Sequence, residues 1–484
     1  MTSVPPMEPL STANRELPVT HGALGDFSDD PVGCLHALQR RHGELAALQE
    51  GDSRIVFVFG PEWNQRVLSD AETFHAWFFT VRGARNSAQR RLTSGLLSMN
   101  GGEHKQHRRM VMGPFQRKSI VEYHDAIVDF AAELLDSWRI GDVRDISLDM
   151  TQFMLRVTSG LLFGLGDDVF ETAYRIGEKI DRWVQLNHDT GLGAFVSDPR
   201  YVRSYDELCG LAVELEHDIQ GLIDRRRGGT LGNDVLSLLI AANDRDGGIS
   251  DQQLIGHVAL MFGAAHLTTA HTFTWTLFLL AQHPAVMREL DGEIRETLAG
   301  DFPRPDDLSN MPVLDRVLKE SMRVLPASGC SHRVCSRATT LGPFELPKGA
   351  PVIFSQYVTH HLPRLYPDPE AFRPDRWRHI SPSAYEYLPF GAGPRMCIGG
   401  PLAMMILKTV LPAILKRCRL SVVPDCEING KIVSTMLGPT TPVPMTVHPA
   451  DGRFNSAPVR GNIHQMVELP GSAEATHPSL RRAA

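Results

Sequence analysis

The chain has 484 residues, 42% of them hydrophobic and 22% charged, which is the composition of an ordinary globular protein. A formal net charge of −7 argues against a nucleic-acid-binding protein, because such domains are usually basic. The 7 cysteines are too few for a disulfide framework. No apolar run approaches the length of about 18 residues that a membrane-spanning helix needs, and the N-terminus does not resemble a signal peptide. We therefore expect a cytoplasmic protein.

In chain order, the sequence first predicts a polar N-terminal extension over residues 1–30. A strand follows at Arg54–Phe59, where β-branched and aromatic residues alternate with few breaks. Apolar residues spaced three and four apart then predict mostly helix from 104 to 300.

The clearest predicted helix runs unbroken from Asp251 to His283. Ser250 and Gln253 have the spacing of a capping box at its start, and Pro284 provides its stop.

Strand and turn patterns dominate residues 341–390, and an apolar helix is expected at 402–417. Residues 449–484 lack periodicity and predict a C-terminal tail, with disorder left open. No internal repeat or linker appears. The sequence therefore predicts one large domain over 31–448, mainly α-helical with small β-sheets.

The loop Phe390-Gly-Ala-Gly-Pro-Arg-Met-Cys-Ile-Gly399 is the sharpest local pattern. Its glycines allow a tight turn close to a flat ligand, and Cys397 lies just before a predicted helix. Free N–H groups at a helix start favour a thiolate, and a thiolate can ligate haem iron. Phe390 could shield the sulfur, and Arg395 could pair with a haem propionate. The alternative is an inert buried cysteine, which is common for a lone Cys but disfavoured by the whole pattern.

This loop resembles the haem-binding loop of the cytochrome P-450 superfamily. An arginine two places before the cysteine follows one common variant, although many bacterial members carry histidine there. The resemblance spans roughly residues 30 to 448 and implies the cytochrome P-450 fold. It also implies haem b (iron protoporphyrin IX) as cofactor, with Cys397 as the metal ligand and Gly391 and Gly399 beside the cofactor.

Glu320 and Arg323 are three residues apart on a predicted helix and can pair. Alone, such a pair is usually an exposed surface feature. The superfamily, however, has an E-x-x-R helix at about this distance before its cysteine, and an F-x-P-x-R segment that Arg376 matches here. The resemblance then implies a buried charge network that holds the cysteine loop.

His104 and Arg108 lie one helical turn apart and could donate to the same propionate. A basic surface helix is the plain alternative. The resemblance to the family's H-x-x-x-R segment favours propionate binding, and Arg333 resembles a further propionate partner.

Lys105, Arg109, Arg117 and Lys118 form a basic patch in an acidic protein. A solvated face is the simple reading, but in relatives this side docks an electron donor. We found no flavin or iron–sulfur segment, so a ferredoxin/ferredoxin reductase pair or a similar donor is expected.

The segment from Ala264 to Thr269 resembles the family's A-G-x-(D/E)-T-T pattern. Small residues, Ala264 and Ala265 followed by Thr268 and Thr269, would leave a notch for dioxygen, although small residues also permit close helix packing. Thr268 offers a hydroxyl that can donate to oxygen and hold a water molecule.

Leu267 stands where the family usually has an acid that relays protons. His266 or His271 could act as a shuttle instead, because imidazole titrates near neutral pH, but a structural role for His266 is favoured. The aromatic residues Trp77, Phe78 and Phe79 could line an apolar pocket or fill the core.

These patterns predict a haem-thiolate monooxygenase that inserts one oxygen atom into an apolar organic substrate. Leu267 motivates one alternative, a peroxide-driven peroxygenase, because peroxide already carries electrons and protons. A haem-binding or sensing protein with little catalysis is the other.

Overall fold

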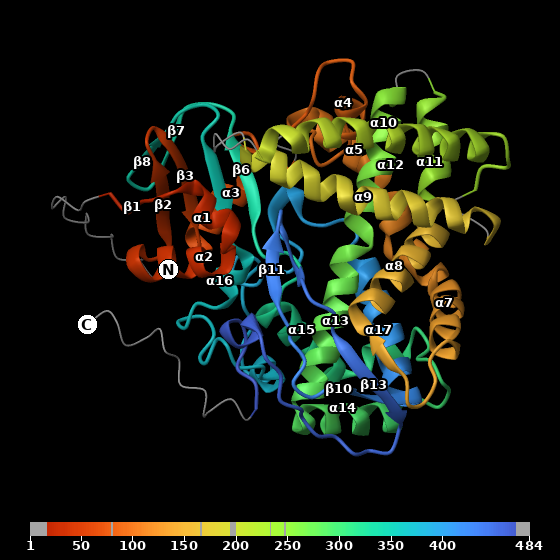
Figure 1. Ribbon diagram of the computed structural model, residues 1–484. Helices are drawn as coiled ribbons and strands as arrows, with labels where there is room; N and C mark the ends of the chain where they lie inside the picture. Colours follow the sequence, from red (N-terminus) through yellow and green to blue (C-terminus); the bar gives the residue numbers. More distant parts are fainter. Residues whose placement is uncertain are drawn as a thin grey trace, which may run out of the picture.

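The computed structural model describes residues 17–78, 81–164, 167–193, 200–232, 234–245 and 248–470. Within them the chain forms one mainly α-helical domain with small β-sheets, as predicted. Strands β1, β2 and β3 near the N-terminus gather on one side with β6 to β8, and the long helices fill the other side (Figure 1). Phe79, residues 1–16 and residues 471–484 lie outside the described residues.

The largest sheet has six strands in the order β1-β2-β3-β9-β6-β4. Its members are β1 (Val19–His21), β2 (Leu45–Glu50), β3 (Ser53–Val58), β9 (Pro351–Phe354), β6 (Ser331–Cys335) and β4 (Phe74–Ala76). The smaller sheets are formed by β10 (Cys418–Val422), β13 (Pro444–Pro449) and β5 (Val143–Asp145), by β11 (Gly430–Val433) and β12 (Met436–Pro439), and by β7 (Thr339–Leu341) and β8 (Phe344–Leu346).

The predicted strand at 54–59 is confirmed as β3, with a shift of one residue at each end. Ile55 to Val58 are buried, since β3 pairs with β2 on one side and with β9 on the other. Central strands of this kind are covered on both faces and read as continuous apolar runs. This sheet carries β6, which forms part of the cavity described below.

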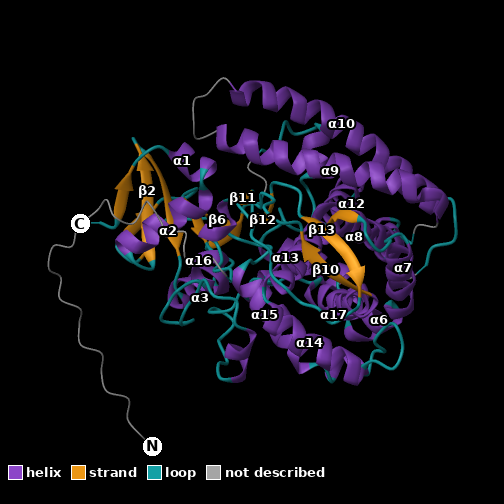
Figure 2. Cartoon of the chain, turned by 60° about the horizontal axis from the view of Figure 1, so that its bottom comes forward, coloured by secondary structure: helices purple, strands orange, loops and turns teal. Residues whose placement is uncertain are grey.

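The helices before the cysteine loop are α1 (Leu24–Asp29), α2 (Pro31–His42), α3 (Pro61–Ser69), α4 (Ala88–Leu92), α5 (Gly101–Val111), α6 (Arg117–Glu122), α7 (His124–Asp136), α8 (Ile146–Phe163), α9 (Asp167–Gly193), α10 (Arg200–Arg227), α11 (Val235–Asn243), α12 (Asp251–Ala265), α13 (Leu267–Gln282), α14 (Pro284–Thr297), α15 (Pro312–Val324) and α16 (Gln356–His360). The last long helix, α17 (Gly400–Arg417), follows the loop. The two longest, α9 and α10, lie side by side along one face of the molecule (Figure 2).

The prediction of one unbroken helix from Asp251 to His283 is wrong, because α12 ends at Ala265 and α13 begins at Leu267. The ring Nδ1 of His266 lies 2.6 Å from the Phe262 carbonyl oxygen, and the Thr268 hydroxyl donates to the Ala264 carbonyl at 3.2 Å. In a regular helix, the Phe262 carbonyl would accept from the backbone N–H of His266, and the Ala264 carbonyl would accept from the backbone N–H of Thr268. Side-chain bonds of this kind bend helices. The predicted capping box is confirmed.

The prediction that residues 449–484 form a separate tail is wrong for the described part. Val459, Ile463, Val467 and Leu469 are buried in the core. Through its backbone, the segment also forms two isolated parallel β-bridges, one between Glu427 and Arg460 and one between Ala371 and Glu468. Apart from the short 3-10 helix Asn462–Gln465 the segment follows an irregular path, so its sequence shows no sustained helical or strand pattern.

The prediction of a polar N-terminal extension is likewise wrong for residues 17–30. Strand β1 pairs with β2, and Leu24 and Phe27 of α1 are buried in the core. Within the described part of the chain, each helix is too short or too polar to cross a bilayer.

Candidate functional site

A cavity of about 380 Å³ lies between α12–α13, α8, the six-stranded sheet and the loop before α17. Every predicted cofactor-binding and catalytic residue except His266 lines it, namely His104, Arg108, Ala264, Ala265, Thr268, Thr269, Arg333, Phe390, Gly391, Arg395, Cys397 and Gly399. Residues more than 290 positions apart in the chain therefore meet at one place. Trp77 and Phe78 also line the cavity.

The cysteine loop folds back on itself, because the Cys397 N–H donates to the Phe390 carbonyl at 2.9 Å. Gly391 and Gly393 have φ of 68° and 70°, a region that favours glycine. A Cβ at Gly393 would also approach the Leu68 carbonyl oxygen to 2.3 Å, so this turn needs glycine for space as well. The turn presents the Cys397 sulfur to the cavity.

Opposing effects act on the Cys397 thiol. Burial raises its pKa above the ordinary value, while the N–H groups of Gly399 and Gly400 and the Arg108 guanidinium act to lower it. The helix start therefore favours the thiolate as predicted, but burial outweighs it. A coordinated metal ion deprotonates a thiol outright, so a metal ion bound to Cys397 would favour the thiolate form.

Three arginines, Arg108, Arg333 and Arg395, line the cavity with His104, and no carboxylate is among the described lining residues. Burial, together with Arg108, lowers the pKa of Arg395 to about 10, and burial with Arg395 lowers that of Arg333 to about 10. Burial and the same two arginines, Arg395 and Arg108, lower the pKa of His104 to about 4. Arginines that face no carboxylate and lower one another's pKa fit an anionic ligand, such as the propionates of haem, and the neutral His104 ring can still donate one hydrogen bond to it.

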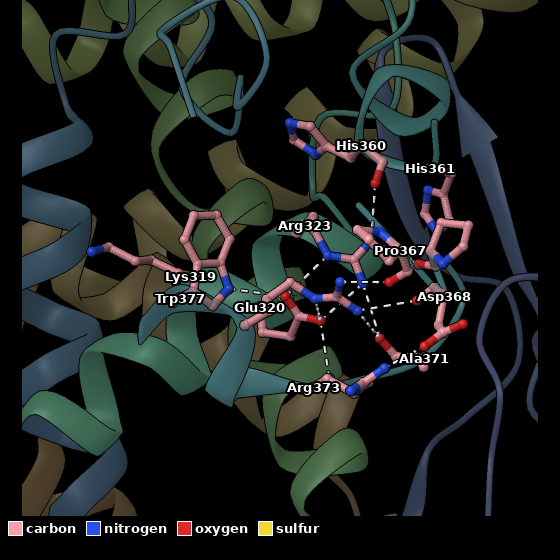
Figure 3. Close-up of polar contacts among 12 residues, drawn as sticks. Lys319, Glu320, Arg323, His360, His361, Pro367, Asp368, Ala371, Arg373 and Trp377 are labelled. Carbon is pink, nitrogen blue, oxygen red and sulfur yellow. Dashed lines mark hydrogen bonds and ion pairs between the residues drawn. The ribbon is translucent and has the colours of Figure 1, made fainter. Parts of the chain in front are cut away.

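Glu320 and Arg323 form the predicted network, and both side chains are fully buried (Figure 3). Glu320 accepts from Arg323 at 2.9 and 3.0 Å, from Arg376 at 2.8 Å and from the Trp377 ring N–H at 2.9 Å. Arg323 donates in addition to the His360 carbonyl at 2.9 Å. The prediction of a buried charge network that includes Arg376 is thus confirmed.

The network reaches the cysteine loop through His360. Burial lowers the pKa of His360 to about 3, and the neutral ring accepts from the Leu388 N–H at 2.7 Å. Leu388 lies two residues before Phe390, so the charged network fixes the start of the loop.

On α12 and α13, Ala264 and Thr268 face the cavity. Leu267 is half-buried and is not part of the cavity lining. His271 does not line it either, and its ring packs against the backbone at Gly438.

His266 is fully buried and contacts α9 instead of the cavity. Its Nε2 lies 3.1 Å from a carboxylate oxygen of Asp181. Burial by itself lowers the pKa of His266, but the Asp181 carboxylate and the Phe262 carbonyl outweigh burial and raise it above the ordinary value. This geometry supports the structural role over a shuttle role.

The His266–Asp181 pair predicts a pH-dependent stability. A group whose folded-state pKa is raised stabilises fully below its unfolded pKa, about 6.5 for histidine, and loses that contribution as the pH rises through the folded pKa. The free-energy advantage of the wild type over His266→Gln is therefore expected to be largest in mild acid and to shrink above neutrality, as measured by urea unfolding at several pH values.

Asp181→Asn is the control for this prediction. Without the carboxylate, only the Phe262 carbonyl opposes burial, so the pKa of His266 falls relative to the wild type and the extra stability in mild acid should shrink. An unchanged pH profile in Asp181→Asn would contradict the assignment.

No sequence pattern pointed to one polar group in the cavity wall. Ser328, Ser331 and Gln356 line the cavity together, although they lie in a loop, a strand and a helix start. Isolated serines and glutamines carry no spacing pattern, so only the fold reveals this group.

Taken together, the cavity fits an iron porphyrin. Its described lining offers one cysteine, three arginines without a carboxylate among them, and apolar residues such as Leu402 and Ile406. Sulfur is a common axial donor to haem iron, and arginines suit the carboxylates.

Comparison with known proteins agrees with this fit. Residues 19–443 match the family model described as Cytochrome P450. The chain is 30% identical over 442 residues to the cyclooctat-9-en-7-ol 5-monooxygenase of Streptomyces melanosporofaciens, covering 88% of this chain and 93% of the relative. It is 27% identical over 441 residues to the pentalenene oxygenase of Streptomyces avermitilis, covering 88% and 95%.

Among solved structures, retinoic acid-bound cyanobacterial CYP120A1 superimposes with a TM-score of 0.73 at 21% identity, covering 87% of this chain and 96% of that one. At this identity the likeness shows the fold. The family match, by contrast, extends across the cysteine loop and the cavity helices. The chain therefore belongs to the cytochrome P450 family of haem-thiolate monooxygenases.

Proposed function

We propose that this P450 inserts one oxygen atom into an apolar organic substrate, with electrons from a separate donor such as a ferredoxin/ferredoxin reductase pair. The observation that carries the proposal is the meeting of Cys397 and Thr268 at one largely apolar cavity. When bound, haem supplies the oxygen activation.

The chain's own residues hold the cofactor and the proton path. Cys397 ligates the iron through its sulfur, and His104, Arg108, Arg333 and Arg395 bind the propionates. The Thr268 hydroxyl, now bonded to Ala264, can rotate to hold a water molecule and pass a proton from its oxygen.

An apolar substrate is supported by the cavity wall, where Trp77, Phe78, Leu161 and Met261 surround the open space. Apolar linings with a few polar groups are typical of small-molecule sites. Two relatives are named for cyclooctat-9-en-7-ol and for pentalenene, and we propose cyclic, mainly hydrocarbon compounds of this type as substrates.

A separate electron donor is supported by the basic patch. Lys105, Arg109, Arg117 and Lys118 are all exposed on α5 and α6, and α5 also carries His104 and Arg108 at the cavity. An acidic partner would be steered to this surface, and its association should weaken as salt is added.

The test is turnover of the purified holoenzyme on a panel of cyclic hydrocarbons under two conditions. One supplies NAD(P)H with ferredoxin and its reductase, and the other supplies hydrogen peroxide alone. We expect oxygenated product in the first condition. Faster turnover with peroxide would instead support the peroxygenase function that Leu267 favours. Spectral binding without any product would support a sensing function.

Leu267→Glu is expected to raise the fraction of reductant that ends in product, by about twofold or more, if proton delivery limits the reaction. Leu267 is the first residue of α13, where an acidic side chain is also favourable to the helix. Coupling is measured as product formed per NAD(P)H consumed. Leu267→Gln is the control, because glutamine has the shape of glutamate without its acidic proton, and it should leave coupling unchanged. Equal gains in coupling in both variants would exclude proton delivery as the cause.

A further inference from the structure

Three polar side chains form a hydrogen-bonded group in the cavity wall. Gln356 begins α16, Ser331 begins β6, and Ser328 lies in the loop before β6. The Gln356 Nε2 donates to the Ser328 hydroxyl oxygen at 3.0 Å and to the Ser331 hydroxyl oxygen at 3.1 Å. All three residues line the cavity.

This arrangement leaves hydrogen-bonding capacity unused. Each serine oxygen accepts from Gln356, and no described residue accepts either O–H hydrogen. Gln356 is only 2% exposed, and its Oε1 is buried without a partner. Buried polar groups are nearly always paired, so unpaired groups at a cavity wall indicate where a ligand oxygen binds.

The backbone around the serines is held on both sides. The Gly329 N–H donates to the Thr435 carbonyl at 2.8 Å, and the Gly329 carbonyl accepts from Tyr357 N–H at 3.0 Å and from the Ser355 hydroxyl at 3.1 Å. The serine hydroxyls are thus positioned before any ligand arrives, which lowers the entropic cost of binding.

The chemistry of the group matches an alcohol better than other oxygen functions. The cavity lining contains no carboxylate, and the neighbours of the serines include Ala327, Phe354 and Met436. With the Gln356 amide in this orientation, its N–H₂ group donates to both serines, and the serine O–H groups can donate to a ligand in the cavity. If the amide turns by 180°, the serine O–H groups donate to the Gln356 Oε1, and the serine oxygens can accept from a ligand. A hydroxyl group both donates and accepts, so it satisfies either arrangement.

The group lies on a different wall from Ala264 and Thr268. Side chains two apart on a strand share a face, so Ser331 lies on the same side of β6 as Arg333, about 6–7 Å along the strand. A hydroxyl bound here would hold one end of a substrate while another part extends toward the α12–α13 wall.

We infer that Ser328, Ser331 and Gln356 form an anchor for a hydroxyl group, so that the substrate class is an apolar ring compound that already carries one alcohol. The inference rests on the proposed function, since it names the substrate of the same cavity. A reaction that installs a hydroxyl group must then precede this one.

The test compares the binding of cedrol and cedrane, two tricyclic compounds that differ by one hydroxyl group, to the holoenzyme and to a Ser328→Ala/Ser331→Ala double variant. Dissociation constants are measured from the ligand-induced Soret shift and, independently, by titration calorimetry. The double variant should bind cedrol about tenfold more weakly and cedrane about equally well, which is the size expected for two neutral hydrogen bonds.

Thr272→Val is the matched control, because Thr272 lines the same cavity but its hydroxyl already donates to the Thr268 carbonyl at 2.9 Å. It should leave both affinities unchanged. Equal effects of the double variant on cedrol and cedrane, no effect on either, or no binding of either ligand to the wild type would overturn the inference. Loss of haem from the double variant would overturn it too, since the serines would then serve a propionate. A holoenzyme that binds cedrol as expected but yields no oxygenated product would refute the proposed function alone.

Discussion

Cys397→Ser is expected to abolish thiolate ligation and to reduce the rate of product formation by about a thousandfold or more. A thousandfold loss corresponds to an activation barrier that is higher by about 4 kcal/mol. Serine keeps the shape of the loop, since its backbone N–H can still donate to Phe390, but its hydroxyl does not replace a thiolate as electron donor to iron. The reduced carbonyl complex should lose the long-wavelength Soret band that is typical of thiolate ligation.

Cys426→Ser is the control for this experiment, because Cys426 is half-buried and is not part of the cavity lining. It should keep both the spectrum and the activity. Retention of the thiolate-type band in Cys397→Ser would mean that another residue ligates the iron, and the assignment of the cavity would fail with it.

Glu320→Gln is expected to destabilise the protein by about 3–5 kcal/mol, because it leaves two buried arginines without their counter-charge. Glu320 accepts from Arg323, Arg376, Trp377 and the Arg373 backbone N–H. A glutamine has one oxygen for these donors and adds an N–H₂ group that faces them. Domains are typically stable by only about 5–15 kcal/mol, so urea unfolding should show a large shift in midpoint and haem content should fall.

Glu289→Gln tests the same chemical change at the surface. Glu289 pairs with Arg316 at 2.9 Å and with Arg378 at 3.1 Å, and its side chain is 39% exposed. Its loss should cost less than about 1 kcal/mol. Equal stability changes in the two variants would show that burial of the Glu320 network adds nothing to the free energy of unfolding.

Several features could be predicted from the sequence because they depend on neighbours in the chain. The turn before Cys397 follows from glycines that tolerate positive φ, and the capping box follows from two residues three positions apart. The helix pair of Glu320 and Arg323 is local as well, although its burial was implied only by the family resemblance.

Other features depend on the three-dimensional fold. The burial of His266 against α9 could not be predicted, because its partner Asp181 is 85 positions away in the chain. The packing of residues 459–469 could not be predicted, since the segment is irregular apart from the single 3-10 turn Asn462–Gln465 and its burial depends on the outline of the domain. The Ser328–Ser331–Gln356 group exists only because β6 and α16 are adjacent.

By itself, the sequence determined the family, the cysteine loop and the glycines that turn the chain before Cys397. These are properties of short segments, in which backbone conformation and adjacent side chains decide the outcome. The tertiary structure alone decided which polar groups remain unpaired at the cavity wall and which histidine is withdrawn from it. Hydrogen bonding between distant segments depends on distances that only the packed fold sets.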